Sequence, residues 1–91
     1  MTKIKDLPRV DRPREKFLKY GPNKLSTTEL LAILLRTGIK GKNVIELSGQ
    51  ILQTIGIKKI KNISFDDLQR IKGLGKVKAL EIVAAIELGK R

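Results

Sequence analysis

The sequence contains no cysteine and no histidine. Without cysteine the chain can form neither a disulfide nor a thiolate metal site, which is typical of a reducing compartment, so we expect a cytoplasmic location. Without histidine there is no imidazole to act as metal ligand, general base or member of a Ser-His-Asp triad. These two absences exclude a zinc site built on such residues, and no catalytic residue is assigned.

Aromatic residues and long apolar runs are also scarce. The three aromatic residues, Phe17, Tyr20 and Phe65, are interpreted as core residues, and so few of them argue against a groove that stacks single-stranded bases. No apolar run is long enough to span a bilayer, and residues 1–6 show no secretory signal, so no membrane partner is expected. Sustained alternation of polar and apolar residues is missing too, which disfavours β-strands.

Acidic residues are outnumbered, with 9 of them against 20 lysines and arginines and a formal net charge of +11. The basic excess is spread over the whole length rather than collected in a tail. A domain this basic favours a polyanionic partner such as a nucleic acid. The alternative is a lysine-rich surface that serves solubility alone.

The remaining pattern predicts an all-α fold of about five short helices in a single domain over residues 1–91. Residues 1–25 are expected to form an N-terminal arm, irregular over residues 1–10, followed by a short helix. That helix starts near Asp11, tolerates Pro13 in its first turn and ends at Gly21.

The middle of the chain is assigned to two helices and a connector. Ser26-Thr27-Thr28-Glu29 is a capping box before a strongly apolar helix, and a second helix is expected from Asn43 to Ile55. These two helices and the turn between them make up residues 26–56. Residues 57–63 form a basic connector, which leaves 64–91 for the last two helices.

The most informative motif is Gly73-Leu74-Gly75, which separates two amphipathic stretches. Glycine permits the backbone angles of a tight turn and leaves no side chain between the backbone N–H groups and an anion. Those N–H groups open the following helix, where free donors and the helix dipole favour a phosphate. Leu74 would anchor the turn in the core, and Lys72, Lys76 and Lys78 would add charge near the phosphate. The pattern predicts a helix-hairpin-helix, which binds nucleic-acid backbones; the alternative is an ordinary αα-hairpin.

A weak internal repeat predicts a second turn of this kind earlier in the chain. Ser26-x-x-Glu29 parallels Ser64-x-x-Asp67, and the turn at 38–42 parallels the one at 73–76, with Gly41 as the counterpart of Gly75. We therefore expect a tandem pair of helix-hairpin-helix motifs, in 26–56 and 64–91, of which the first is degenerate. The residues predicted to contact a second phosphate are Gly38, Lys40, Gly41 and Lys42. Convergent patterning of two αα-hairpins is the alternative.

Several segments are specific enough to suggest a family. Arg12-Pro13-Arg14-Glu15-Lys16, the run from Glu29 to Gly38, Lys40-Gly41-Lys42 and the closing Ala85-Ile86-Glu87-Leu88-Gly89 resemble the N-terminal region of the bacterial RadC family. The resemblance covers nearly all 91 residues, and the run from Glu29 to Gly38 is its most specific part.

The resemblance implies the N-terminal domain of a longer protein. Members of that family normally continue into a C-terminal domain of the JAB/MPN metalloprotease-like type, which binds zinc through a His-x-His and an Asp. No histidine is present here to supply such ligands, so the zinc chemistry is not carried over to this chain. The family is labelled with DNA repair, and the resemblance implies DNA association through the hairpin.

The helix-hairpin-helix resemblance also bears on cations and on catalysis. Proteins with this module often hold a monovalent cation through main-chain carbonyls, which by position would be those of Gln69, Ile71 and Leu74. Base-excision glycosylases share the hairpin, but the bifunctional ones place a lysine nucleophile where this chain has Val77. The adjacent carboxylates Asp66-Asp67 are explained by the first turn of a helix. The chain is therefore expected to be non-enzymatic.

Taken together, these patterns predict sequence-independent binding of duplex or branched DNA through hairpin amides and lysines. No set of side chains suited to reading base edges stands out, so binding should respond to salt rather than to base sequence. The alternative function is a protein-interaction or regulatory module for the JAB/MPN domain. The oligomeric state, and whether the first hairpin touches DNA, stay open.

Overall fold

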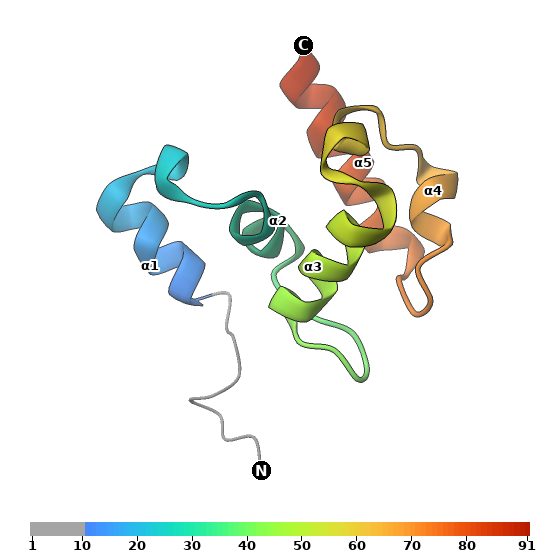
Figure 1. Cartoon of the computed structure of the whole chain (residues 1–91), viewed down its shortest axis with the longest axis horizontal. Coiled ribbons are helices and arrows are strands. Elements are labelled where there is room, and N and C mark those ends of the chain that lie inside the picture. The colour runs from blue at the N-terminus through green and yellow to red at the C-terminus, as the bar shows by residue number, and fades with distance from the viewer. Residues whose placement is uncertain (1–10) are drawn as a thin grey trace. The chain divides into compact units, whose positions relative to one another are not determined.

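The computed structural model describes residues 11–91, so the expectation of an irregular arm over residues 1–10 lies outside the described part. Within residues 11–91 every regular element is helical, which confirms the predicted all-α class (Figure 1). The elements are α1 (Asp11–Tyr20), the 3₁₀ helix η2 (Pro22–Lys24), α2 (Thr27–Leu35), α3 (Val44–Ile55), the 3₁₀ helix η3 (Ile57–Asn62), α4 (Phe65–Gln69) and α5 (Lys76–Lys90).

The chain divides into two compact units, Met1–Gly49 and Gln50–Arg91, and the boundary falls inside α3. The first unit therefore holds α1, α2 and the start of α3, and the second holds the rest of α3 with α4 and α5. Each unit has its own buried apolar residues and is described by itself. The expected single domain and its internal boundaries after residues 25, 56 and 63 remain predictions.

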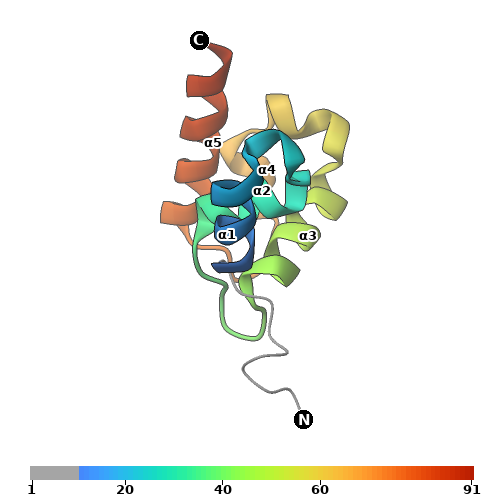
Figure 2. The ribbon, with the colours of Figure 1, turned by 90° about the vertical axis from the view of Figure 1, so that its left-hand side faces the viewer.

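In the first unit, α1 packs beside α2 (Figures 1 and 2). Pro13 lies buried in the first turn of α1, and the helix ends where the Gly21 N–H donates to the Phe17 carbonyl at 2.7 Å. Gly21 has a φ of +89° and a ψ of 167°, backbone angles that glycine adopts readily because it has no Cβ. The buried apolar side chains of this unit are Leu25, Leu31, Ala32, Leu35, Val44 and Leu47.

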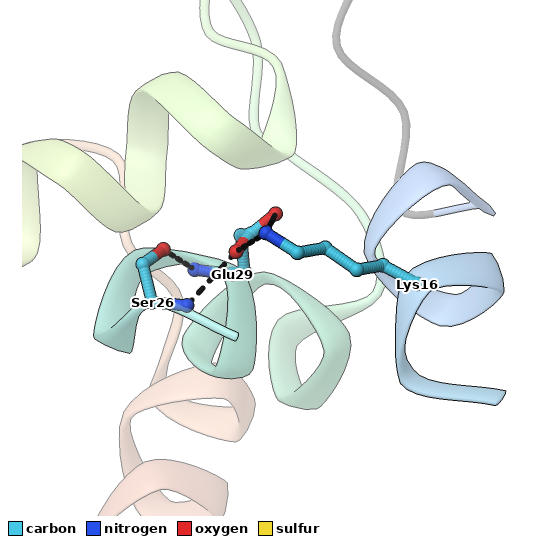
Figure 3. A network of polar contacts seen from close by, with 3 residues as sticks. All are labelled: Lys16, Ser26 and Glu29. Carbon is cyan, nitrogen blue, oxygen red and sulfur yellow. Dashed lines mark hydrogen bonds and ion pairs between the residues drawn. The ribbon is translucent and has the colours of Figure 1, made fainter. Parts of the chain in front are cut away.

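A polar contact joins α1 to the start of α2 (Figure 3). The Ser26 Oγ accepts the Glu29 N–H at 3.1 Å while the Glu29 carboxylate accepts the Ser26 N–H at 2.8 Å, which is the predicted capping box. Lys16 reaches from α1 to the same carboxylate, with Nζ 3.2 Å from Oε1. Glu29 thus caps the N-terminus of α2 and also forms an ion pair with Lys16 of α1.

The second unit has its own apolar core, formed by residues of α3, α4, α5 and the segments that connect them. Its buried apolar side chains are Ile51, Ile55, Ile63, Leu68, Ile71, Leu74, Ala79 and Ile82. The stretch predicted as a basic connector is largely the 3₁₀ helix η3, on which Lys58, Lys59 and Lys61 are exposed. The connector is thus an ordered element that carries positive charge on its surface.

The aromatic residues correct one expectation. Phe17 and Tyr20 are exposed rather than in the core, and Phe65 is half-buried. Lys16 of α1 contacts Glu29 of α2, while Phe17 keeps 38% and Tyr20 56% of their surface exposed. Two of the three aromatic side chains are therefore available at the surface.

Candidate nucleic-acid interface

The second hairpin begins with α4, whose position is set by a capping box. The Ser64 Oγ accepts the Asp67 N–H at 3.0 Å, and Asp67 Oδ2 accepts the Ser64 N–H at 3.1 Å. The hydrogen bond from the Ser64 backbone, helped by that from its side chain, holds the pKa of Asp67 below its ordinary value. α4 therefore starts at a defined residue, and its short length brings the chain quickly to the turn.

The turn itself is held by backbone hydrogen bonds and two buried side chains. The Ile71 N–H donates to the Leu68 carbonyl at 3.1 Å, and the Leu74 N–H donates to the Ile71 carbonyl at 3.1 Å. Gly73 has a φ of +86°, which a side chain would strain, so the turn needs glycine there. Ile71 and Leu74 are both buried, as expected for Leu74, and they fasten the turn to its unit.

The N-terminus of α5 follows directly and has no side-chain cap. Gly75 is the N-cap residue, and its carbonyl accepts the Ala79 N–H at 3.1 Å, so the helix is regular from its first turn. The first N–H groups of an α-helix have no carbonyl partner within the helix. No acidic residue lies in this first turn; Lys76 and Lys78 occupy it instead. The end of α5 thus presents N–H donors and positive charge together.

Glycine at position 75 is not demanded by the fold. Its φ of −74° and ψ of 161° are ordinary extended angles, and a Cβ built there would meet no atom within 4 Å. The backbone conformation requires glycine at position 73, whereas it does not require glycine at position 75. A side chain at position 75 would therefore project beside the start of α5 without displacing an atom of the fold.

The predicted lysines of this hairpin differ in exposure. Lys72 and Lys76 are exposed, whereas Lys78 is half-buried. Arg70, which the sequence analysis did not single out, also lies at this turn, with Nη2 3.8 Å from Asp67 Oδ1 and an exposed side chain. Its signal was present in the sequence as one more basic residue just before the glycines.

The first turn resembles the second in backbone conformation, but its residues correspond to those of the second turn differently from what the internal repeat predicts. The Ile39 and Lys42 backbones exchange two hydrogen bonds of 3.0 Å, and Gly41 has a φ of +88°. Gly41 therefore corresponds in conformation to Gly73, and not to Gly75 as the internal repeat suggested. Asn43 is then the counterpart of Gly75, immediately before the next helix.

Asn43 caps the start of α3 with its side chain, which glycine at position 75 cannot do for α5. The Asn43 Oδ1 accepts the Glu46 N–H at 2.8 Å, and Glu46 Oε1 accepts the Asn43 N–H at 2.9 Å. This third capping box was overlooked, although Asn-x-x-Glu before an apolar helix is its sequence signal. A side-chain acceptor and a carboxylate thus occupy the start of α3, where the start of α5 has neither.

The other predicted residues of the first turn have mixed roles. A Cβ at Gly38 would overlap the Lys42 carbonyl oxygen and lie 2.7 Å from the Asn43 carbonyl carbon, so this glycine permits a close backbone approach. Lys40 and Gly41 are exposed, and Lys42 is half-buried. The first turn therefore offers positive charge, and its glycines are explained by the fold.

The carbonyls predicted to hold a monovalent cation lie around the second turn. Gln69 ends α4, Ile71 lies in the turn, and Leu74 directly precedes the N-cap. The Ile71 carbonyl already accepts the Leu74 N–H and keeps one further lone pair. Cation binding by these carbonyls stays a prediction.

Among residues 11–91 no three acidic side chains gather as metal ligands would. Over the same part of the chain, no helix combines the length and apolar character needed to cross a bilayer.

Comparisons with known proteins give a consistent match. Residues 4–80 match the family model described as UPF0758 N-terminal. The chain is 50% identical over 90 residues to a UPF0758 protein of Bacillus licheniformis, covering 98% of this chain and 40% of that protein. It is 48% identical over 90 residues to the UPF0758 protein YsxA of Bacillus subtilis, covering 98% of this chain and 39% of the relative. The chain thus spans about 40% of the length of these curated relatives, and no solved structure matches it.

Proposed function

The chain belongs to the UPF0758 family through that N-terminal region, and from this premise we propose that it is a DNA-binding domain of a longer, RadC-like protein. It binds the sugar-phosphate backbone of duplex or branched DNA without reading sequence and without catalysing a reaction. In this proposal it acts in the bacterial cytoplasm, directs its protein to DNA, and serves the repair role with which RadC proteins are labelled.

The observation that carries the proposal is the start of α5. The helices α2, α3 and α4 each begin with a side-chain capping box that contains an acidic residue. α5 begins with Gly75, with no side-chain cap and with lysines in its first turn. Backbone donors, the helix dipole and two lysine charges favour a phosphate at this point.

The remaining predicted residues take supporting roles. Exposed Lys72 and Lys76 contact the phosphate or its neighbour, and Leu74 holds the turn in place from below. Lys40 at the first turn adds an electrostatic contact only, because the start of α3 is closed by Asn43 and Glu46. A monovalent cation at the hairpin carbonyls would bridge the turn to a phosphate oxygen.

The test compares two variants in a duplex-binding titration. Gly75→Val adds a side chain over the α5 donors without changing charge, and we expect the dissociation constant for a short duplex to rise about tenfold or more. Gly49→Ala, on α3, meets no atom within 4 Å and serves as the control for an added side chain. Equal affinity of both variants and the unchanged chain would refute the proposal.

A second function is supported by the outer face of α5. Val77, Leu80 and Leu88 are exposed there, Leu88 by 75%, so the helix is apolar on more than its buried side. We propose that this face contacts the remaining part of the longer protein. In an amide NMR titration with that part, shifts confined to residues near Leu80 and Leu88 support the contact, and unchanged spectra refute it.

A further inference from the structure

The first unit carries an exposed apolar surface that the hairpin function does not use. An open depression of about 480 Å³, solvent at its mouth included, is lined by Arg14, Phe17, Leu18 and Ile33. Leu18 is 84% exposed, and Phe17 is 38% exposed. The floor is thus aromatic and aliphatic, and the one charged lining residue is a guanidinium.

The aromatic character extends along α1 beyond the depression. Tyr20 is 56% exposed and lies three residues after Phe17, a spacing that puts both rings on neighbouring positions of one helix face. The Lys19 Nζ lies 5.3 Å from the centroid of the Tyr20 ring, a cation–π contact that covers one side of that ring. Arg14, Phe17 and Tyr20 follow one another at intervals of three along the helix.

We propose that the surface formed by Arg14, Phe17, Leu18 and Tyr20 of α1 with Ile33 of α2, called the α1 face below, binds unpaired bases of single-stranded DNA. One base lies in the depression against Phe17 and Leu18, and the next stacks near Tyr20. Arg14, which lies on the other side of Phe17 from Tyr20, contacts the phosphate on the far side of the base in the depression. Stacking on aromatic side chains beside a basic groove is how single strands are bound without sequence preference. The inference rests on the proposed function and narrows its substrate to DNA with a single-stranded segment beside a duplex.

The charge of this helix favours a nucleic acid over a protein segment. α1 carries four basic residues, Arg12, Arg14, Lys16 and Lys19, against two acidic ones, Asp11 and Glu15, and Lys16 is paired with Glu29. A purely apolar docking surface needs neither a guanidinium at its edge nor flat rings in sequence along a helix. A base with its phosphate matches both features, since the base is flat and the phosphate is an anion.

The experiment uses the single tyrosine of the chain. Incorporation of 3-fluorotyrosine gives one ¹⁹F resonance, which reports on Tyr20 alone. We expect the resonance to shift and saturate with an eight-residue oligo-dT, and to stay in place with a blunt duplex or with inorganic polyphosphate. A shift that polyphosphate reproduces, or no shift with oligo-dT, would overturn the proposal.

Two variants separate stacking from apolar contact and from charge. Phe17→Leu keeps an apolar side chain but removes the ring, and we expect oligo-dT to bind about tenfold more weakly while duplex affinity is unchanged. Lys24→Gln removes one exposed charge from η2 in the same unit and should leave both affinities within about twofold. If both variants lost the same oligo-dT affinity, binding would reflect general electrostatic attraction, and the stacking proposal would be refuted.

The same resonance distinguishes the failure of this inference from failure of the hairpin function. In the Gly75→Val background the limiting oligo-dT shift should persist, because Tyr20 and Gly75 belong to different units. Loss of duplex binding with retention of this shift identifies two sites. If the remaining part of a full-length relative shifts the resonance and oligo-dT does not, the α1 face is a protein-docking surface and the inference is overturned.

Discussion

At the scale of single residues, Gly73 and Gly75 show how one motif contains a structural and a functional requirement. Gly73 has a φ of +86°, and alanine there would be strained. We expect Gly73→Ala to lower the free energy of unfolding by about 1 kcal/mol, because the left-handed conformation disfavours a Cβ. Urea unfolding followed by circular dichroism checks this. Gly49→Ala is the control, because a Cβ at position 49 would meet no atom within 4 Å.

Gly75→Asp should change stability and DNA binding in opposite directions. Aspartate is a favourable N-cap residue, so its carboxylate would accept the first N–H groups of α5 and raise the unfolding free energy by a few tenths of a kcal/mol. The same carboxylate would occupy the phosphate position and repel the backbone of DNA, weakening duplex binding about tenfold or more. Thermal unfolding and a duplex titration on one protein sample measure both effects.

A matched control separates the cap from the charge. Ala84→Glu adds the same negative charge on an exposed position of α5, about 13 Å along the helix from Gly75. We expect it to weaken duplex binding far less than Gly75→Asp does. Similar losses in the two variants would mean that net charge, and not the α5 N-terminus, controls affinity.

At the scale of elements, one carboxylate, that of Glu29, contributes a polar contact between α1 and α2. The hydrogen bond from the Ser26 backbone, followed by that from Lys16, holds the pKa of Glu29 below its ordinary value (Figure 3). A carboxyl group with a lowered folded-state pKa stabilises the fold above its unfolded pKa, and this contribution is lost as the pH falls through the folded value. Stability should therefore decline on acidification below about pH 4.5.

Glu29→Gln is expected to flatten that pH dependence. Glutamine preserves the N3 position of the capping box but carries no charge for Lys16, so stability at neutral pH falls and the acid-induced loss becomes smaller. Urea unfolding between pH 3 and pH 7 gives the measurement. Glu15→Gln, on exposed α1, removes one acid without removing this contact, and an identical flattening there would contradict the assignment.

The positions of the helices could be predicted from local sequence signals, whereas the exposure of individual side chains could not. Ser26-x-x-Glu29, Ser64-x-x-Asp67 and Gly21 mark ends that the structure reproduces, because caps act within four residues. The Asn43 box carried an equally local signal and was overlooked. The exposure of Phe17 could not be predicted, since it depends on which residues of α2 face α1, a tertiary property.

The candidate site was predictable in outline and not in register. Gly73, Leu74 and Gly75 lie at the turn and helix end that their spacing indicated. The predicted correspondence of Gly41 with Gly75 was wrong, because Gly41 has a positive φ and Gly75 a negative one. The sequence alone does not show which glycine has a positive φ. That distinction separates a glycine required by the turn from one whose missing side chain leaves donors open.

At the scale of the whole molecule, the net charge of +11 would attract any polyanion, so salt dependence has to be resolved residue by residue. A lysine that contacts a duplex phosphate contributes about 0.9 to the slope of log affinity against log salt concentration. We expect Lys76→Gln to weaken duplex binding and reduce the slope by about 1, whereas Lys24→Gln changes neither appreciably. Gly75→Val should weaken binding with a nearly unchanged slope, because it adds a side chain beside the donors and leaves the charge unchanged. Fluorescence anisotropy titrations between 50 and 200 mM salt give the slopes. If each lysine variant lost affinity and slope alike, the domain would be a diffuse polycation, and the ordered start of α5 would have no special part in DNA binding.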